Sequence, residues 1–411
     1  MATTNTGRAA RAAEPAVRVA GDWRPALNLT LATLGFAVCF WAWALLGPLA
    51  PGIKERLGLS FAEQSLVVAV PVIVGSLGRI PVGALTDRFG ARLMLPAVSL
   101  ATVVPVLVLA YTQTSYAGLI VAGFFLGIGG TAFAVGVPYV SGWYPPDRRG
   151  FALGIFGIGM GGTAIANFTT VPLADASGAK APFFLVAAVL VGYAVLALAL
   201  IRDAHPPGVG ASALRRTAAA SRLAVTWQLC FLYAVGFGGF VAFSVYLPAY
   251  LRTAYQLRPA DAALRTAGFV VVAVVARPIG GWLSDRLHPV PVLVTCFSGV
   301  AGLAVLQAFQ PALIPWATVA LLGMAGLLGA AAGGVFALVG KVAPAGQVGA
   351  VTGLVGAAGG LGGFVPPLVM GWVYGVEHSY SIGLMLLSDI ALAAAVYTAV
   401  KMAGLARSSD R

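Results

Sequence analysis

Long apolar segments follow one another along nearly the whole chain, and they constrain its fold more than any other feature. Of the 411 residues, 59% are hydrophobic and only 9% are charged, and the mean hydropathy is +0.92. A soluble domain has about a quarter of its residues charged, so this chain lacks the side chains to cover a surface in water. We therefore expect most of its surroundings to be lipid.

The apolar segments are about 20 residues long, which is the length that a helix needs to cross a bilayer. In lipid, only helices and closed β-barrels satisfy the backbone, and the segments lack the alternation of barrel strands. The sequence therefore predicts an all-α, polytopic membrane protein with twelve transmembrane helices. The predicted spans are 28–50, 64–85, 93–112, 115–142, 149–174, 181–201, 226–251, 263–283, 291–309, 313–340, 348–375 and 380–402.

A polar stretch in the middle of the chain divides these spans six and six. The amino-terminal tail has no apolar core, so we do not expect a cleavable signal peptide. The predicted parts are a disordered cytoplasmic tail at 1–25, an N-terminal six-helix half at 26–201, a central cytoplasmic loop at 202–225, a C-terminal six-helix half at 226–402 and a cytoplasmic tail at 403–411.

The distribution of Lys and Arg predicts the orientation in the membrane. With both termini in the cytoplasm, seventeen of the 25 basic residues fall on the cytoplasmic side, six fall outside and two lie within spans. This bias fits a multi-pass protein of the cell membrane with both termini cytoplasmic. It also explains the net charge of +12 through topology and contact with the lipid bilayer, so we expect no nucleic-acid partner.

The two halves of the chain repeat one another. Residues 79–88 of the second span resemble residues 277–286 of the eighth, with Arg and Asp eight residues apart in both copies and an offset of 198 between them. Glycine pairs in the fourth and tenth spans share an offset of 199: Gly127 and Gly130 with Gly326 and Gly329. Two pseudo-symmetric halves are the architecture of alternating-access carriers, which bind substrate near mid-membrane between the halves.

Arg79 and Arg277 are the only basic residues well inside apolar spans. A central Arg costs about 2.5–3.5 kcal/mol on insertion scales, so each needs a compensating partner. Of the 13 acidic residues, only Asp389 falls well inside a span. A bound anion would complete the site, since guanidinium is a natural fork for a planar oxyanion. The alternative is that each Arg bonds helix carbonyls or a single structural acid.

A second motif lies at the cytoplasmic ends of spans 2 and 8, where charge is inexpensive. Its first copy, which reads Gly-x-x-x-Asp-Arg-x-Gly-x-Arg, resembles the signature loop of the major facilitator superfamily. We expect these residues to pair with neighbouring helix ends and latch one conformation. The predicted latch residues are Gly83, Asp87, Arg88 and Arg92 in the first copy and Asp285 and Arg286 in the second.

Several stretches resemble the nitrate/nitrite porter family within that superfamily. They are Gly75–Gly83 in span 2, Phe231–Ser244 in span 7, Arg265–Gly268 with Arg277-Pro278 in span 8, and Gly353–Phe364 in span 11. The resemblance covers nearly all of the membrane region and implies a carrier for nitrate and nitrite. It implies that Arg79 and Arg277 clamp the anion.

The same resemblance implies that Tyr233 and Phe237, one turn apart, sandwich the anion together with Phe133 of span 4. Ordinary core packing is the alternative for each ring. Spans 5 and 11 are rich in glycine, and we expect Gly157 and Gly356 to expose backbone to a small substrate. Tight packing of helices is the alternative for these glycines.

One position departs from the family pattern. Span 5 has Met160 where the family's first signature has an asparagine, and Met cannot donate a hydrogen bond. Asn167, seven residues further on, returns to nearly the same helix face and is the candidate substitute. The departure puts the identity of the anion in question more than the fold.

The coupling mechanism is open between two forms. The spans offer no central histidine, because His205, His288 and His378 lie in loops or at span ends. A proton relay is then hard to build, and exchange of nitrate for nitrite fits best. Proton symport remains an alternative, for which Asp389 is the first residue to test.

Other classes of function fit less well. A carrier for an organic anion would need a larger cavity with fewer arginines, and a receptor would need an output domain. No nucleophile–base pair or phosphate-binding loop indicates an enzyme. The cysteines Cys39, Cys230 and Cys296 have no metal-ligand spacing, so neither a metal nor a cofactor is expected. Carriers of this architecture usually work as monomers, and we expect the same here.

Overall fold

The computed structural model describes residues 23–204, 213–344, 347–402 and 404. Within this part every regular element is a helix, and twelve spans are long and apolar enough to cross a membrane. Both findings confirm the predicted all-α fold and the number of spans. The two predicted tails, 1–25 and 403–411, lie almost entirely outside the described residues.

The N-terminal half contains six spans, several of them built from two or three shorter helices. They are α1 (Arg24–Trp43) with α2 (Leu46–Leu57), α3 (Phe61–Leu77) with α4 (Arg79–Phe89), α5 (Ala91–Thr112), α6 (Tyr116–Leu126) with η1 (Gly127–Thr131) and α7 (Ala132–Trp143), α8 (Pro146–Gly157) with η2 (Ile158–Gly161) and α9 (Gly162–Ser177), and α10 (Ala181–Leu200).

The C-terminal half contains the other six. They are α12 (Ala224–Tyr255), α13 (Pro259–Leu287), α14 (Pro289–Ala308), η3 (Leu313–Ala317) with α15 (Thr318–Val342), α16 (Val348–Gly362) with α17 (Val365–Glu377), and α18 (Ser381–Tyr397) with η4 (Thr398–Met402).

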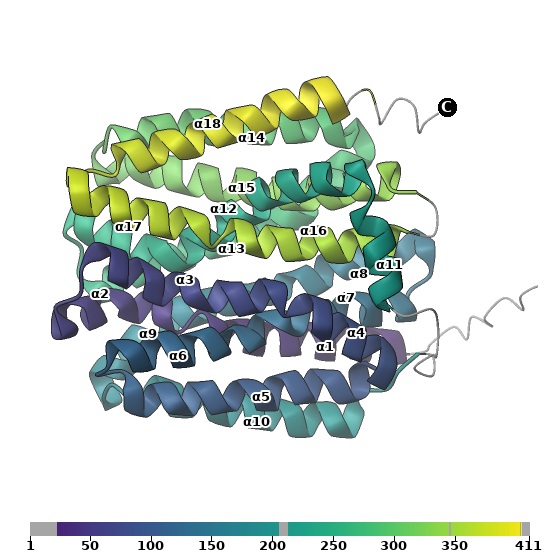
Figure 1. Cartoon of the computed structure of the whole chain (residues 1–411), viewed down its shortest axis with the longest axis horizontal. Coiled ribbons are helices and arrows are strands. Elements are labelled where there is room, and N and C mark those ends of the chain that lie inside the picture. The colour runs from purple at the N-terminus through teal and green to yellow at the C-terminus, as the bar shows by residue number, and fades with distance from the viewer. Residues whose placement is uncertain (1–22, 205–212, 345–346, 403, 405–411) are drawn as a thin grey trace, which may run out of the picture.

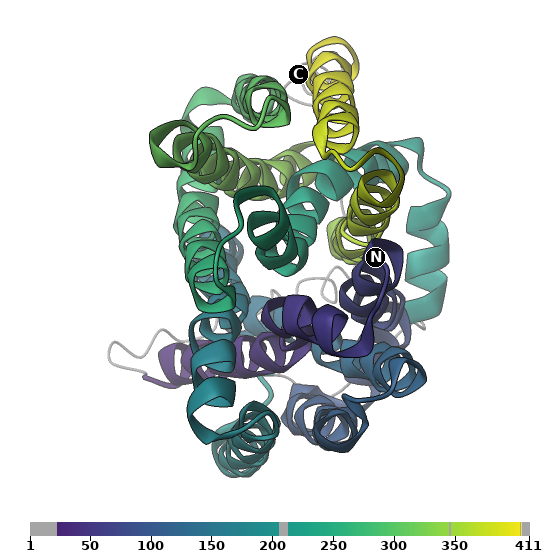
Figure 2. The ribbon, with the colours of Figure 1, turned by 90° about the vertical axis from the view of Figure 1, so that its left-hand side faces the viewer.

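The two halves lie side by side as two bundles, the first purple to blue and the second green to yellow in Figures 1 and 2. The turns from α2 to α3 and from α17 to α18 lie at one end of the molecule, and α11 (Ala213–Ser221) lies at the other. Following the predicted orientation, we call the end with the α2–α3 turn the outer end and the end with α11 the inner end.

The central segment is more ordered than a loop. Residues 202–225 were predicted to be loop, yet they contain α11, a helix of nine residues that packs against α4 and α16. The sequence from Ala213 to Ser221 is rich in Ala and Arg, which are strong helix formers. The segment therefore contacts both halves at the inner end.

Glycines allow the close packing at the middle of the molecule. Gly130 and Gly329, which correspond in the internal repeat, each lie against a neighbouring helix. A Cβ on Gly130 would lie 2.8 Å from the Cα of Gly75, and one on Gly329 would overlap the carbonyl oxygen of Ala273. At these two positions the lack of a side chain lets the helix backbones approach closely.

Candidate anion-binding site

Arg79 enters the site from a break in the second span. It is the first residue of α4, which follows α3 after a change of helix at Gly78. Its side chain is only 7% exposed. Its Nη1 donates to the carbonyl oxygen of Gly356, and its Nε donates to that of Gly130 at 3.4 Å. Since Gly130 belongs to the N-terminal half and Gly356 to the C-terminal half, Arg79 joins the two.

Arg277 lies in the middle of α13 and is also 7% exposed. Its Nη2 donates to the hydroxyl of Tyr233 at 3.0 Å, and its Nη1 lies 2.8 Å from the sulfur of Met160. Tyr233 is in the same half, whereas Met160 is in η2 of the other half. Both arginines therefore reach across the boundary between the halves.

Both arginines lie near the ring of Phe237. The guanidinium carbon of Arg79 lies 5.9 Å from the centre of this ring, and that of Arg277 lies 5.4 Å from it. Tyr233, one turn earlier on α12, stacks on Phe237 with a centroid distance of 5.0 Å and an angle of 2° between the planes. Arg79, Arg277, Tyr233 and Phe237 therefore lie close together, and their predicted contact with an anion stays a prediction.

Two further aromatic rings lie against the arginines. The ring centre of Phe133 lies 5.1 Å from the guanidinium carbon of Arg79, and that of Phe336 in α15 lies 5.7 Å from the guanidinium carbon of Arg277. Sequence reasoning missed Phe336. The available signal was its place in the tenth span, which corresponds to the fourth span and its Phe133.

Two glycines make room for the arginines and the rings. A Cβ on Gly157 would lie 3.5 Å from Nε of Arg277, and one on Gly356 would lie 3.1 Å from the ring of Phe133. Both glycines therefore lie beside the arginines and the rings, and their predicted exposure to the substrate stays a prediction. Gly356 contributes its carbonyl to Arg79.

The charge of the site is positive and uncompensated. Every contact that the structure gives the two guanidinium groups, in the part of the chain it describes, is with a neutral group: two carbonyls, a phenol, a thioether and three rings. The carbonyl alternative is correct for Arg79, but a carbonyl satisfies donors without cancelling charge. Two buried cations beside the same ring are suited to hold a small anion.

The structure separates Met160 from Asn167. Met160 is fully buried and contacts Arg277, so the departure from the family pattern lies within the site. Asn167 is also buried, in α9, and its amide nitrogen donates to the carbonyl of Thr163 on its own helix at 2.8 Å. No contact with either arginine is given for Asn167, so its predicted role as a substitute stays a prediction.

The predicted latch residues lie apart from the arginines, at the inner end. Arg88 and Arg286 rest on the neighbouring rings of Phe89 and Trp282, at 5.2 Å and 4.4 Å. The backbone N–H groups of Ala91 and Arg92 donate to the carboxylate of Asp203, at 2.9 Å and 3.3 Å.

Asp203 therefore caps the start of α5, and sequence reasoning missed this role. The role of Gly83, Asp87 and Asp285 in a latch stays a prediction.

Asp389 lies away from the site. It is exposed on α18, beside Leu386 and Ile390, whose side chains are 43% and 49% exposed. The contacts of the two arginines include no atom of α18. Of the three histidines, His288 and His378 flank helix ends, and His205 is outside the described residues.

Comparison with known proteins places the chain among transporters. The family model for the Major Facilitator Superfamily matches residues 32–402. The chain is 51% identical over 379 residues to the probable nitrate/nitrite transporter NarK2 of Mycobacterium tuberculosis, an alignment that covers 91% of this chain and 96% of the relative. It is 40% identical over 377 residues to the nitrite extrusion protein of Bacillus subtilis, covering 91% and 93%.

Among solved structures, the human organic anion transporter MFSD10 superposes with a TM-score of 0.73, covering 91% of this chain and 99% of that one. The identity is 16%, so this likeness concerns the fold alone.

Proposed function

Because the chain belongs to the Major Facilitator Superfamily and, within it, to the nitrate/nitrite porter family, we propose that it carries nitrate and nitrite across the cell membrane, held by Arg79 and Arg277. It is a transporter and not an enzyme. The observation that carries the proposal is the pair of buried guanidinium groups at 5.9 Å and 5.4 Å from the centre of the Phe237 ring, whose partners among the described residues are all neutral.

The site suits a small planar oxyanion. A guanidinium group presents parallel N–H donors that match two oxygens of such an anion, and the rings cover its faces. Phe133, Phe237, Tyr233 and Phe336 leave the arginines in a close aromatic enclosure, which favours nitrate or nitrite over an organic anion with a bulky body.

The same geometry supports alternating access. Arg79 bonds Gly356 of the other half, and Arg277 contacts Met160 of the other half. Rocking of the two halves relative to each other would break these contacts. Each arginine would then move with its own half, together with the oxygens of the anion that it binds, toward one side of the membrane. We also infer that both termini face the cytoplasm and that each chain transports as a monomer.

Exchange follows from the charge of the empty site. Without an anion, the two guanidinium groups repel one another in a medium of low dielectric, and the carrier would have to reorient with both charges uncompensated. With one anion bound, a single positive charge remains. The loaded carrier therefore reorients more readily than the empty one, which couples entry of one anion to exit of another.

Transport into proteoliposomes tests this proposal. We expect external nitrate to enter vesicles preloaded with nitrite and to enter empty vesicles far more slowly, with or without a pH gradient. Uptake into empty vesicles that rises with inward proton flow would replace exchange by symport. Intact protein that moves neither nitrate nor nitrite under any of these conditions would refute the assignment of the substrate.

A further inference from the structure

A hollow of about 340 Å³ lies at the outer end, between the two halves. The N-terminal half contributes Lys54 and Glu55 from α2 and Gln64 from α3, and the C-terminal half contributes Arg252 from α12 and Arg258 after it. Gln64 precedes Arg79 by fifteen residues of the second span, or about 20 Å of helix. The hollow is therefore separate from the central arginines.

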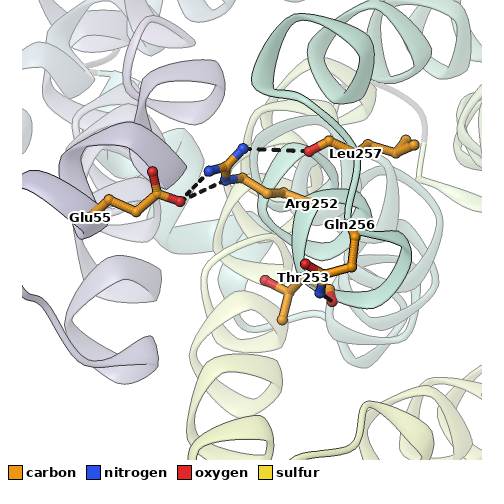
Figure 3. Close-up of polar contacts among 5 residues, drawn as sticks. All are labelled: Glu55, Arg252, Thr253, Gln256 and Leu257. Atoms are coloured by element: carbon orange, nitrogen blue, oxygen red, sulfur yellow. Dashed lines mark hydrogen bonds and ion pairs between the residues drawn. The ribbon is translucent and has the colours of Figure 1, made fainter.

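An ion pair crosses this hollow from one half to the other. Nε of Arg252 donates to Oε1 of Glu55 at 2.9 Å, and Nη2 of Arg252 bonds the same oxygen (Figure 3). The remaining nitrogen, Nη1, has only a long contact of 3.5 Å with the carbonyl of Leu257. Glu55 thus acts as a built-in anion on Arg252, and it uses one of its two oxygens to do so.

Other donors face the same hollow. Gln64 is only 3% exposed and lines the same hollow. The ammonium of Lys54 rests 4.2 Å from the centre of the Phe61 ring. Arg258 pairs with Asp261 at 3.0 Å. Lys54 and Arg252 then face the single carboxylate of Glu55, so the charge of the hollow is positive.

We propose that this hollow is a second anion-binding site, for the same small oxyanions as the central site, in which the anion replaces Glu55 on Arg252. The inference rests on the proposed function for the class of ligand. The fork of Arg252 holds two oxygens of the anion, and the Lys54 ammonium and the Gln64 amide donate to it from the other half.

Occupation of this site affects the outer mouth. Glu55 is attached to α2, so its bond to Arg252 ties α2 directly to α12. An anion in its place is part of neither helix, so it joins the two halves only through its hydrogen bonds to Arg252, Lys54 and Gln64. An anion that arrives from outside therefore meets this site before it reaches Arg79 and Arg277.

Nitrate binding to the purified full-length protein tests the proposal, measured by titration calorimetry at constant ionic strength. We expect a second, weaker binding event that persists in Arg277→Leu. In that background, Glu55→Gln should tighten this event and Lys54→Gln should weaken it, each by about two- to fivefold, as for exposed ion pairs. Arg56→Gln is the matched control: it removes the same charge from an exposed neighbour outside the hollow and should change neither event.

The outcomes separate this inference from the proposed function. Binding of nitrate by the wild type that disappears entirely in folded Arg277→Leu would overturn the second site and leave the proposed function intact. A wild type that shows the outer binding event but no central one would refute the proposed function and leave the second site intact.

If Arg277→Leu does not fold, the test uses variants that keep Arg277. The quantity measured is the external nitrate concentration at which uptake is half-saturated. The half-saturation concentration should fall about two- to fivefold in Glu55→Gln and rise similarly in Lys54→Gln, and equal values in both variants would refute the site.

Discussion

Arg277 and Met160 are in direct contact, with Nη1 of the arginine 2.8 Å from the sulfur of the methionine. The contact joins α13 of one half to η2 of the other. A thioether is a weak acceptor and cannot donate, so Met160 occupies one donor of Arg277 and offers nothing to a bound anion. The position that departs from the family pattern is thus where substrate affinity is most open to change.

Met160→Asn should tighten nitrate binding while the fold stays intact. An amide at this position can accept from Arg277 and donate to the anion, and one neutral hydrogen bond contributes about 0.5–1.5 kcal/mol, or about two- to tenfold in affinity. Titration calorimetry with nitrate measures the change. Met160→Leu keeps the bulk and removes the acceptor, so it should leave affinity within about twofold. Unchanged affinity in Met160→Asn would show that this side chain does not face the bound anion.

Arg79→Lys should abolish most nitrate transport. Lysine keeps the charge but cannot donate to Gly130 and Gly356 while presenting a second edge to the anion. Loss of one hydrogen bond to a charged group costs about 1.5–3 kcal/mol, which is about ten- to 150-fold in affinity. Nitrite-loaded proteoliposomes measure the rate, and Arg56→Lys at the exposed outer surface controls for the same chemical change. Full uptake by Arg79→Lys would rule out the clamp.

The sequence predicted the spans and the arginine pair for physical reasons. Twelve long apolar segments have few alternatives in a bilayer, and a buried cation such as Arg79 or Arg277 is costly enough to mark a site by itself. The repeat placed both arginines in corresponding spans. Their meeting at Phe237 then follows from the packing of two similar halves.

The features that the sequence did not predict depend on which side chains meet across the halves. Phe336 reaches Arg277, Met160 touches Arg277, and Arg252 bonds Glu55 only once the bundles are packed together. None of these pairs has a characteristic spacing along the chain. Asp203 was missed for a similar reason, since it caps a helix that begins more than a hundred residues earlier.

Asp389→Asn should leave transport and its dependence on a pH gradient unchanged. Asp389 faces outward from α18, among exposed apolar side chains, and no contact links it to the arginines. A proton relay needs a carboxylate that the transported anion or its water can reach. Uptake by wild type and variant, each with and without a pH gradient, is the comparison. Selective loss of the proton-driven component in the variant would place Asp389 in a coupling path.

Gly359→Ala should reduce transport in a protein that still inserts and folds. A Cβ at Gly359 would overlap the ring of Tyr233 and come within 3.2 Å of Phe237, so the added methyl group must displace the stacked pair that contacts Arg277. Overpacking of this kind costs about 1–3 kcal/mol.

Gly353→Ala makes the same substitution six residues earlier on α16, where nothing lies within 4 Å of the new methyl group, and it should leave transport unchanged. Uptake rate and thermal unfolding of both variants separate displacement of Tyr233 from a general effect on the helix. Equal transport by the two variants would mean that the Tyr233–Phe237 stack does not set the position of Arg277.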